Sequence, residues 1–171
     1  MAIAIQFLIS NFPLNALILA ILLAIGARYI WKTNRSFAEG MTLYLFLLPV
    51  GLAGLWGFGF HAFAPDFTAE SIGWQPSPFQ FEVAVANLGV GLAGIFAFWR
   101  KNIQFCLGVL IVETCFLWGA AYGHIKDIIV AGNWAPSNAG SILWTDILIP
   151  IFLIVSMIFW KRNQQIKLRT F

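Results

Sequence analysis

Five long apolar segments, separated by short polar or basic stretches, dominate the hydropathy pattern of the chain. Each is long enough for a helix that crosses a bilayer, which needs about 20 mostly apolar residues. The pattern therefore predicts an all-α polytopic membrane bundle, in one domain over residues 1–171, with N-terminus outside and C-terminus inside. The spans are expected at about 13–31, 41–61, 78–99, 103–131 and 142–160. Residues 1–12 are too short to span alone, so we expect them to extend the first helix or to lie along the interface.

Composition supports the membrane assignment, because 60% of the residues are hydrophobic and only 10% are charged. A soluble domain carries about 25% charged residues. The net charge of +3 does not indicate a nucleic-acid partner, since the basic residues flank apolar segments instead of lining a polar face. The expected partner is the lipid bilayer. The first apolar stretch has no basic n-region and no small-residue cleavage site, so we do not expect a removable signal peptide.

The distribution of Lys and Arg predicts the orientation of the chain. Nine of the ten basic residues fall on one side of the predicted spans, and Lys126 alone falls on the other. By the positive-inside rule, loops 62–77 and 132–141 lie outside the cytoplasm. We expect the cytoplasmic (inner) membrane of a bacterium, with the aromatic-rich loop 62–77 as a lid at headgroup level.

Ionisable residues within the spans are informative because a charge in hydrocarbon costs at least ~2.5 to 3.5 kcal/mol. Glu82, Glu113 and Asp146 lie inside predicted spans, and His61 and His124 lie at the outer ends of two others. All five fall in the outer half of the membrane. At the helical rise, the third and fourth spans place Asn87 and Glu113 roughly 18 to 20 Å above the inner interface. We therefore expect the two side chains to form a hydrogen bond, and Glu82 and Glu113 to face other helices.

Small residues predict where helices approach closely. In the third span, Ala86, Gly89 and Ala93 share a face with Glu82, and Gly91 and Gly94 share a second face with Asn87. Small residues on two faces favour a central position in the bundle and also permit oligomer contacts. The second span carries a similar glycine stripe below His61, formed by Gly51, Gly54 and Gly57. The two cysteines, Cys106 and Cys115, lie on opposite sides of one helix and cannot form a disulfide with each other.

Histidines and carboxylates from several helices are the ligand set of metal sites in helical bundles. The leading hypothesis is a pocket that binds a divalent metal, zinc or iron, and acts on a membrane-soluble small molecule. Its first candidate ligands are His61, Glu82 and His124, with Asp127 or Asp146 as a fourth. Glu113 and Asn87 form a deeper layer, in which they would relay protons.

Each residue also has a simpler explanation. The histidines can be interfacial residues with wet polar ends, and Glu82 can be an acid that satisfies free N–H groups at a helix start. Glu113 can be a protonated acid bonded to Asn87. At the level of function, the rivals are a proton- or cation-coupled transporter using Glu113 and Asp146, and a structural or accessory subunit. The half of the spans nearer the cytoplasm argues against a transporter, because Ser156 and Gln104 are the only polar residues found there that could continue a transport path.

No phosphate-binding loop, CxxC pair, zinc-protease motif or nucleophile elbow is present, and GxGxxG at 89–94 lies within a span. One set of short motifs nevertheless resembles the signature of a bacterial family of small integral-membrane proteins of unknown function. The motifs are HAFAP at 61–65, IGW at 72–74, SPFQFE at 77–82, ANLG at 86–89, GHI at 123–125 and NAG at 138–140, with Asp146 and Pro150. The resemblance covers residues 41 to about 155 and implies a free-standing multi-span protein. It implies no activity.

Overall fold

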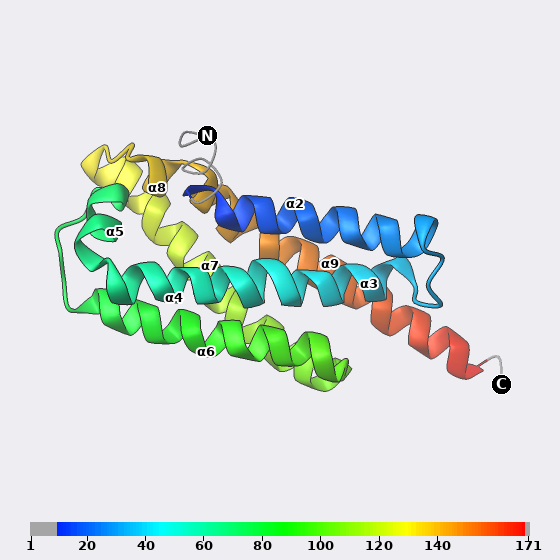
Figure 1. Ribbon diagram of the computed structural model, residues 1–171. Coiled ribbons are helices and arrows are strands. Elements are labelled where there is room, and N and C mark those ends of the chain that lie inside the picture. Colours follow the sequence, from blue (N-terminus) through cyan, green and yellow to red (C-terminus); the bar gives the residue numbers. More distant parts are fainter. Residues whose placement is uncertain (1–9, 170–171) are drawn as a thin grey trace.

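The computed structural model describes residues 10–169, and every regular element in this part of the chain is helical (Figure 1). Five helical segments are long and apolar enough to cross a membrane. They are Phe12–Ile30, Phe37–Phe63, Phe79–Arg100, Ile103–Ala131 and Pro136–Ile166. The prediction of an all-α bundle with five spans is confirmed, and the protein is a multi-pass membrane protein. Residues 1–9, most of the predicted interfacial segment, lie outside the described part.

The second span begins earlier than predicted, at Phe37 instead of residue 41. Ser36 caps helix α3 (Phe37–Leu45), and its hydroxyl oxygen accepts a hydrogen bond from the Glu39 backbone N–H at 3.2 Å. Ser36 and Glu39 have the spacing of a capping box, a helix-start signal that is present in the sequence. The boundary prediction failed because it followed hydropathy alone.

Two spans contain wide π-helical turns that the hydropathy pattern does not reveal. Helix α2 (Phe12–Ile25) continues into η1 (Gly26–Ile30), and α3 continues through η2 (Phe46–Leu52) into α4 (Ala53–Phe63). Pro49 lies inside η2 and lacks the N–H of a regular helical bond. The wide turn accommodates the proline, so the second span continues through it.

Glycines join α4 and η2 closely to α6 (Phe79–Arg100). A methyl group on Gly54 would lie 2.8 Å from the Gly91 Cα atom, and one on Gly94 would lie 2.7 Å from a Val50 methyl group. The predicted close approach of these two spans is therefore confirmed. The predicted central position of the third span is wrong, because Gly89, on the other small face, has open space around it. Helix α6 packs through one face only and lies at the edge of the bundle.

Helix α7 (Ile103–Ala131) packs against α9 (Ser141–Arg169), and α9 packs against α3. At the end of the bundle near the C-terminus, these helices form an apolar core that includes the fully buried residues Leu43, Phe46 and Leu153. One polar pair lies within it, since the Thr42 hydroxyl donates to Ser156 Oγ at 2.9 Å. Figure 1 shows α7 crossing away from α6 toward the opposite end of the molecule.

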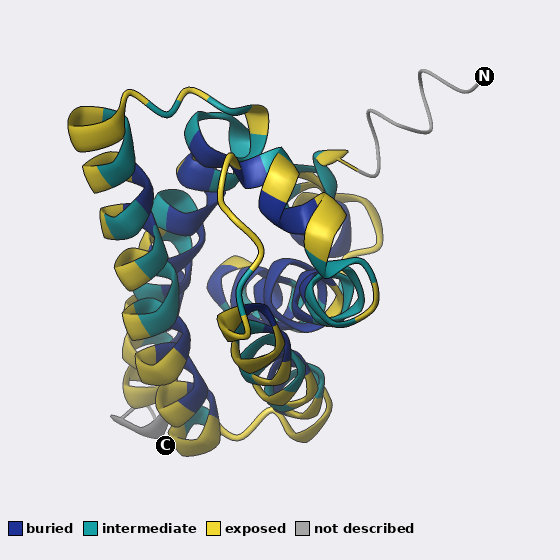
Figure 2. Cartoon of the chain, turned by 90° about the vertical axis from the view of Figure 1, so that its left-hand side faces the viewer, coloured by how far each residue is buried: buried dark blue, intermediate teal, exposed yellow. Residues whose placement is uncertain are grey.

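That opposite end is covered by two short helices, α5 (Pro65–Ile72) and α8 (Pro136–Ala139), and we call it the capped end (Figure 1). The region predicted as a loop is therefore partly helical, because Pro65 occupies the first turn of α5 and Gly73 ends it with φ +82°. The last span also begins earlier than predicted, at α8. Seen from the capped end, the helices turn buried residues toward one another and exposed residues outward (Figure 2).

Candidate functional site

A chamber of about 910 Å³ lies beneath the capped end. Helices α4, α6, α7 and α9 form its walls, and residues of α5, α8 and the loop after α5 also line it. Most of the lining is apolar, with a marked aromatic share formed by Trp56, Phe60, Phe67, Trp74 and Phe116. The lining includes two histidines, two carboxyl groups and one amide side chain, namely His61, His124, Glu113, Asp146 and Asn87. Large apolar cavities with a few converging polar groups are typical of small-molecule sites.

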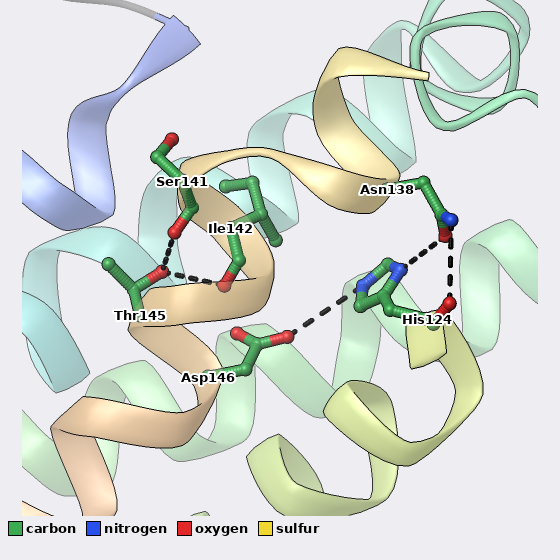
Figure 3. A network of polar contacts seen from close by, with 6 residues as sticks. All are labelled: His124, Asn138, Ser141, Ile142, Thr145 and Asp146. Carbon is green, nitrogen blue, oxygen red and sulfur yellow. Dashed lines mark hydrogen bonds and ion pairs between the residues drawn. The ribbon is translucent and has the colours of Figure 1, made fainter. Parts of the chain in front are cut away.

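His124 is held in one orientation by Asn138. The Asn138 side-chain amide group donates to the backbone carbonyls of Asn133 at 2.8 Å and of His124 itself at 3.5 Å. These bonds direct the Asn138 Oδ1 atom toward His124 Nδ1, 2.7 Å away, so Nδ1 carries the hydrogen (Figure 3). In neutral His124, Nε2 therefore has a free lone pair, and it faces Asp146 Oδ2 at 3.7 Å (Figure 3).

Glu113 and Asp146 bring two carboxyl groups into the chamber from α7 and α9. The residues are only 4% and 7% exposed, and both line the same chamber. Asp146 faces His124, whereas Glu113 has no hydrogen-bond partner among the described residues. A buried polar group without a partner is costly, so the Glu113 carboxyl is a site prepared for a ligand group or for water.

Asn87 does not bond to Glu113, although both residues line the chamber. Its side-chain amide donates instead to the Val83 carbonyl of its own helix at 2.9 Å. The prediction of an Asn87–Glu113 hydrogen bond is wrong, because α7 crosses away from α6 and the chamber separates the two helices at this level. Asn87 instead packs beside Gly57, whose added methyl would lie 3.0 Å from Asn87 Oδ1.

His61 lines the chamber, and its Nδ1 atom pairs with Gln80 Oε1 on the first turn of α6. Glu82 is exposed and is not part of the lining, so the prediction that it faces other helices is wrong. Two residues correspond to about 200° around a helix, so Gln80 faces α4 whereas Glu82 points away from it. Glu82 lies in the first turn of α6, where an acid interacts favourably with the helix dipole.

Asp127 connects the cap to α7 and does not line the chamber. Its Oδ2 atom accepts hydrogen bonds from Trp74 Nε1 at 3.1 Å and from the Asn133 side-chain amide at 2.6 Å. The same amide group of Asn133 also donates to the Ile72 carbonyl at the end of α5 at 2.8 Å. Trp74 in turn stacks on His124, with ring centroids 6.1 Å apart. Asp127 therefore fixes the roof over the histidine.

The candidate metal ligands are thus distributed over several places. Within residues 10–169, no three His, Cys, Asp or Glu side chains form a group that could hold a metal ion. His124 and Asp146 are the two candidates that face each other, and Glu113 is the other carboxyl residue in the described lining of the chamber. The zinc or iron hypothesis remains a prediction, and metal analysis of the purified protein tests it.

Two residues of the site were not assigned a role from the sequence. Asn138 orients His124, and Gln80 pairs with His61. Both belong to the short motifs that carry the family resemblance, in SPFQFE and NAG, which was a usable signal. Periodicity alone could not find them, because each acts on a residue of a different helix.

The fold and the chamber define a five-span helical membrane protein with a capped, polar-lined cavity. Residues 10–166 match a family described as a family of unknown function (DUF6790), and the chain belongs to this family. No curated protein and no solved structure matches the chain.

Proposed function

We propose that this protein binds a membrane-soluble small molecule in the chamber and holds its polar part at Glu113, Asp146 and His124. The observation that carries the proposal is Glu113, a buried carboxyl without a hydrogen-bond partner among residues 10–169, in an otherwise mostly apolar cavity. Aromatic walls take up the apolar body of a ligand, and the few polar groups set its orientation.

The polar groups of the site can transfer a proton to or from a ligand as well as bind it. With Nδ1 bonded to Asn138, His124 accepts a hydrogen bond or a proton at Nε2. Asp146 faces this atom from α9, and Glu113 lines the same chamber from α7. A ligand group between them therefore meets acceptors from two helices, and the site can take up a proton from it or return one.

The chamber is open toward the lipid-facing side of the bundle. Cys115 and Gly119 on α7 line the chamber and are also exposed. Because lining residues that are also exposed mark where the chamber reaches the surface, we place a side entrance beside them on α7. A ligand dissolved in the bilayer can enter there without crossing the cap.

The positive-inside rule places the chamber in the outer half of the membrane. Nine of the ten Lys and Arg residues belong to the end opposite the cap, and Lys126 alone belongs to the capped end. We propose that the capped end faces the outside of a bacterial cytoplasmic membrane.

Reporter fusions test this orientation. We expect a cytoplasmic signal from a reporter after Phe171 and an external signal from one inserted at 134–135, between α7 and α8. The physical reason is the charge asymmetry, since cytoplasmic loops retain Lys and Arg. An external signal from the C-terminal reporter would overturn the orientation.

The packing beneath the chamber favours a binding site over a transport path. The inner half is a core of buried apolar side chains, and Thr42 and Ser156 are bonded to each other within it. A coupled carrier needs polar groups on both sides of its site, and among the described residues the buried core of this half contains only that polar pair.

A chamber-filling variant tests the proposed function. A side chain at Gly119 would meet no atom within 4 Å of its Cβ, so Gly119→Trp should fill the chamber without displacing the backbone. The probe is radiolabelled 4-phenylbutan-1-ol, which is apolar, compact and uncharged. We expect saturable binding to the detergent-solubilised protein by equilibrium dialysis, with protein-free micelles as the blank. Gly119→Trp should weaken it at least ~10-fold, equivalent to 1.4 kcal/mol.

Gly108→Trp is the matched control. Gly108 lies on the same helix, also has open space around its Cβ, is exposed and does not line the chamber. We expect it to bind the alcohol like the unmodified protein. Equal binding by both variants, or only non-saturable partitioning, would contradict a ligand site in the chamber.

A further inference from the structure

We infer that the ligand of this chamber is a cationic amphiphile, a compact apolar body with one primary ammonium group that binds between Glu113 and Asp146. This inference rests on the proposed function and adds the chemical class of the ligand. The evidence for it is that the described lining of the chamber contains two carboxyl groups and no Lys or Arg.

The chamber has acidic groups but no permanent positive charge. Two carboxyl groups, from α7 and α9, lie in its lining, and no Lys or Arg is present among its described lining residues. Two like charges in a space of low dielectric constant repel each other strongly, and a cation between them removes the repulsion. An anionic ligand would add a third negative group, so the chamber discriminates against fatty acids and other carboxylates.

The number of acceptors matches a primary ammonium group. Such a group has three N–H donors and no acceptor. The site offers the Glu113 carboxylate, the Asp146 carboxylate and the His124 Nε2 lone pair. Glu113 is otherwise without a partner within the described chain, so the ligand would satisfy an acceptor that the protein leaves unpaired.

The amine can reach the site without carrying its charge through lipid. It enters from the bilayer as the neutral base and takes the proton of a protonated carboxyl group. The nitrogen lone pair forms the new N–H bond, the carboxyl O–H bond breaks, and an ammonium ion remains beside a carboxylate. No other reactant is needed, and the reverse step releases the neutral amine.

The aromatic walls fit the same ligand. Trp56 and Phe60 on α4 and Phe116 on α7 surround the space with apolar rings. Aromatic faces attract cations within about 6 Å of the ring centre, more strongly where water is excluded. The walls therefore bind the apolar body and tolerate its charge.

Three probes that differ only in the head group test the inference. They are 4-phenylbutylamine, 4-phenylbutan-1-ol and 4-phenylbutanoate, measured by equilibrium dialysis at neutral pH in the same uncharged detergent. We expect the amine to bind at least ~10-fold more tightly than the alcohol and the carboxylate to bind more weakly than both. Glu113→Gln and Asp146→Asn should reduce amine binding to the level of the alcohol while retaining alcohol binding, which also reports that the variant is folded.

Glu82→Gln is the matched control, because it removes an exposed acid outside the chamber and should keep the preference for the amine. Equal affinity of the unmodified protein for amine and alcohol would overturn the inference and leave the proposed function standing. Absence of saturable binding of all three probes would overturn the proposed function itself. If an acid variant fails to fold, the ratio of amine affinity to alcohol affinity in the unmodified protein still tests the inference.

Discussion

Alanine in place of Gly54 is expected to lower the free energy of unfolding by roughly 1–3 kcal/mol, the usual cost of overpacking a close-packed interior. The added methyl group would lie 2.8 Å from the Gly91 Cα atom and 2.9 Å from the Asn87 carbonyl oxygen. Both atoms belong to the backbone of α6, so no side chain can rotate away and the helices must separate. Thermal unfolding of the purified protein in detergent measures the change.

Gly59→Ala provides the control on the same helix. Its methyl group would meet nothing within 4 Å, so we expect a gain of about 0.5–1 kcal/mol from the higher helix propensity of alanine. The two substitutions are chemically identical, and the expected effects have opposite signs. A Gly54→Ala protein as stable as the Gly59→Ala protein would show that α4 and α6 do not approach closely.

Leucine in place of Asn138 is expected to disrupt the cap, at roughly 1–3 kcal/mol for each buried polar group that loses its partner. Asn138 is fully buried and bonds to His124 Nδ1 and to the carbonyls of Asn133 and His124. A side chain of similar size without polar atoms leaves these groups unpaired. We expect a lower unfolding temperature and faster hydrogen exchange at α8 and in the preceding loop.

Asn163→Leu makes the same substitution where no hydrogen bond is lost. Asn163 is half-buried on α9, far from the cap, and has no side-chain partner among the described residues. We expect its stability to change by no more than ~0.5 kcal/mol. Normal exchange protection of α8 in the Asn138→Leu protein would mean that Asn138 does not hold the cap in place.

The chamber results from the way in which two pairs of helices pack. Glycines bring α4 and α6 into backbone contact, while α7 leaves α6 and packs along α9. The space between the two groups of helices is closed at one end by the apolar core and at the other by α5, α8 and Trp74. The site therefore depends on helix arrangement more than on any single sequence motif.

Part of the site could be predicted from the sequence. Glu113 lies far from both ends of its predicted span, where a side chain cannot reach interfacial water, so it had to face protein. The structure buries Glu113, which lines the chamber together with Asp146. Glu82 is not forced to face protein, because it lies in the first turn of α6, near the end of the span. Its side chain is exposed.

By itself, the sequence determined the all-helical class, the five spans and the burial of Glu113. These follow from local properties, since bilayer thickness sets the length of a span and hydrocarbon penalises a charge wherever the chain folds. Only the tertiary structure decided that Gln80 faces His61, that Asn138 orients His124 and that Asn87 does not reach Glu113. Each of these depends on the distance and rotation between two helices, which side-chain packing across the whole bundle sets and which the periodicity of one helix does not contain.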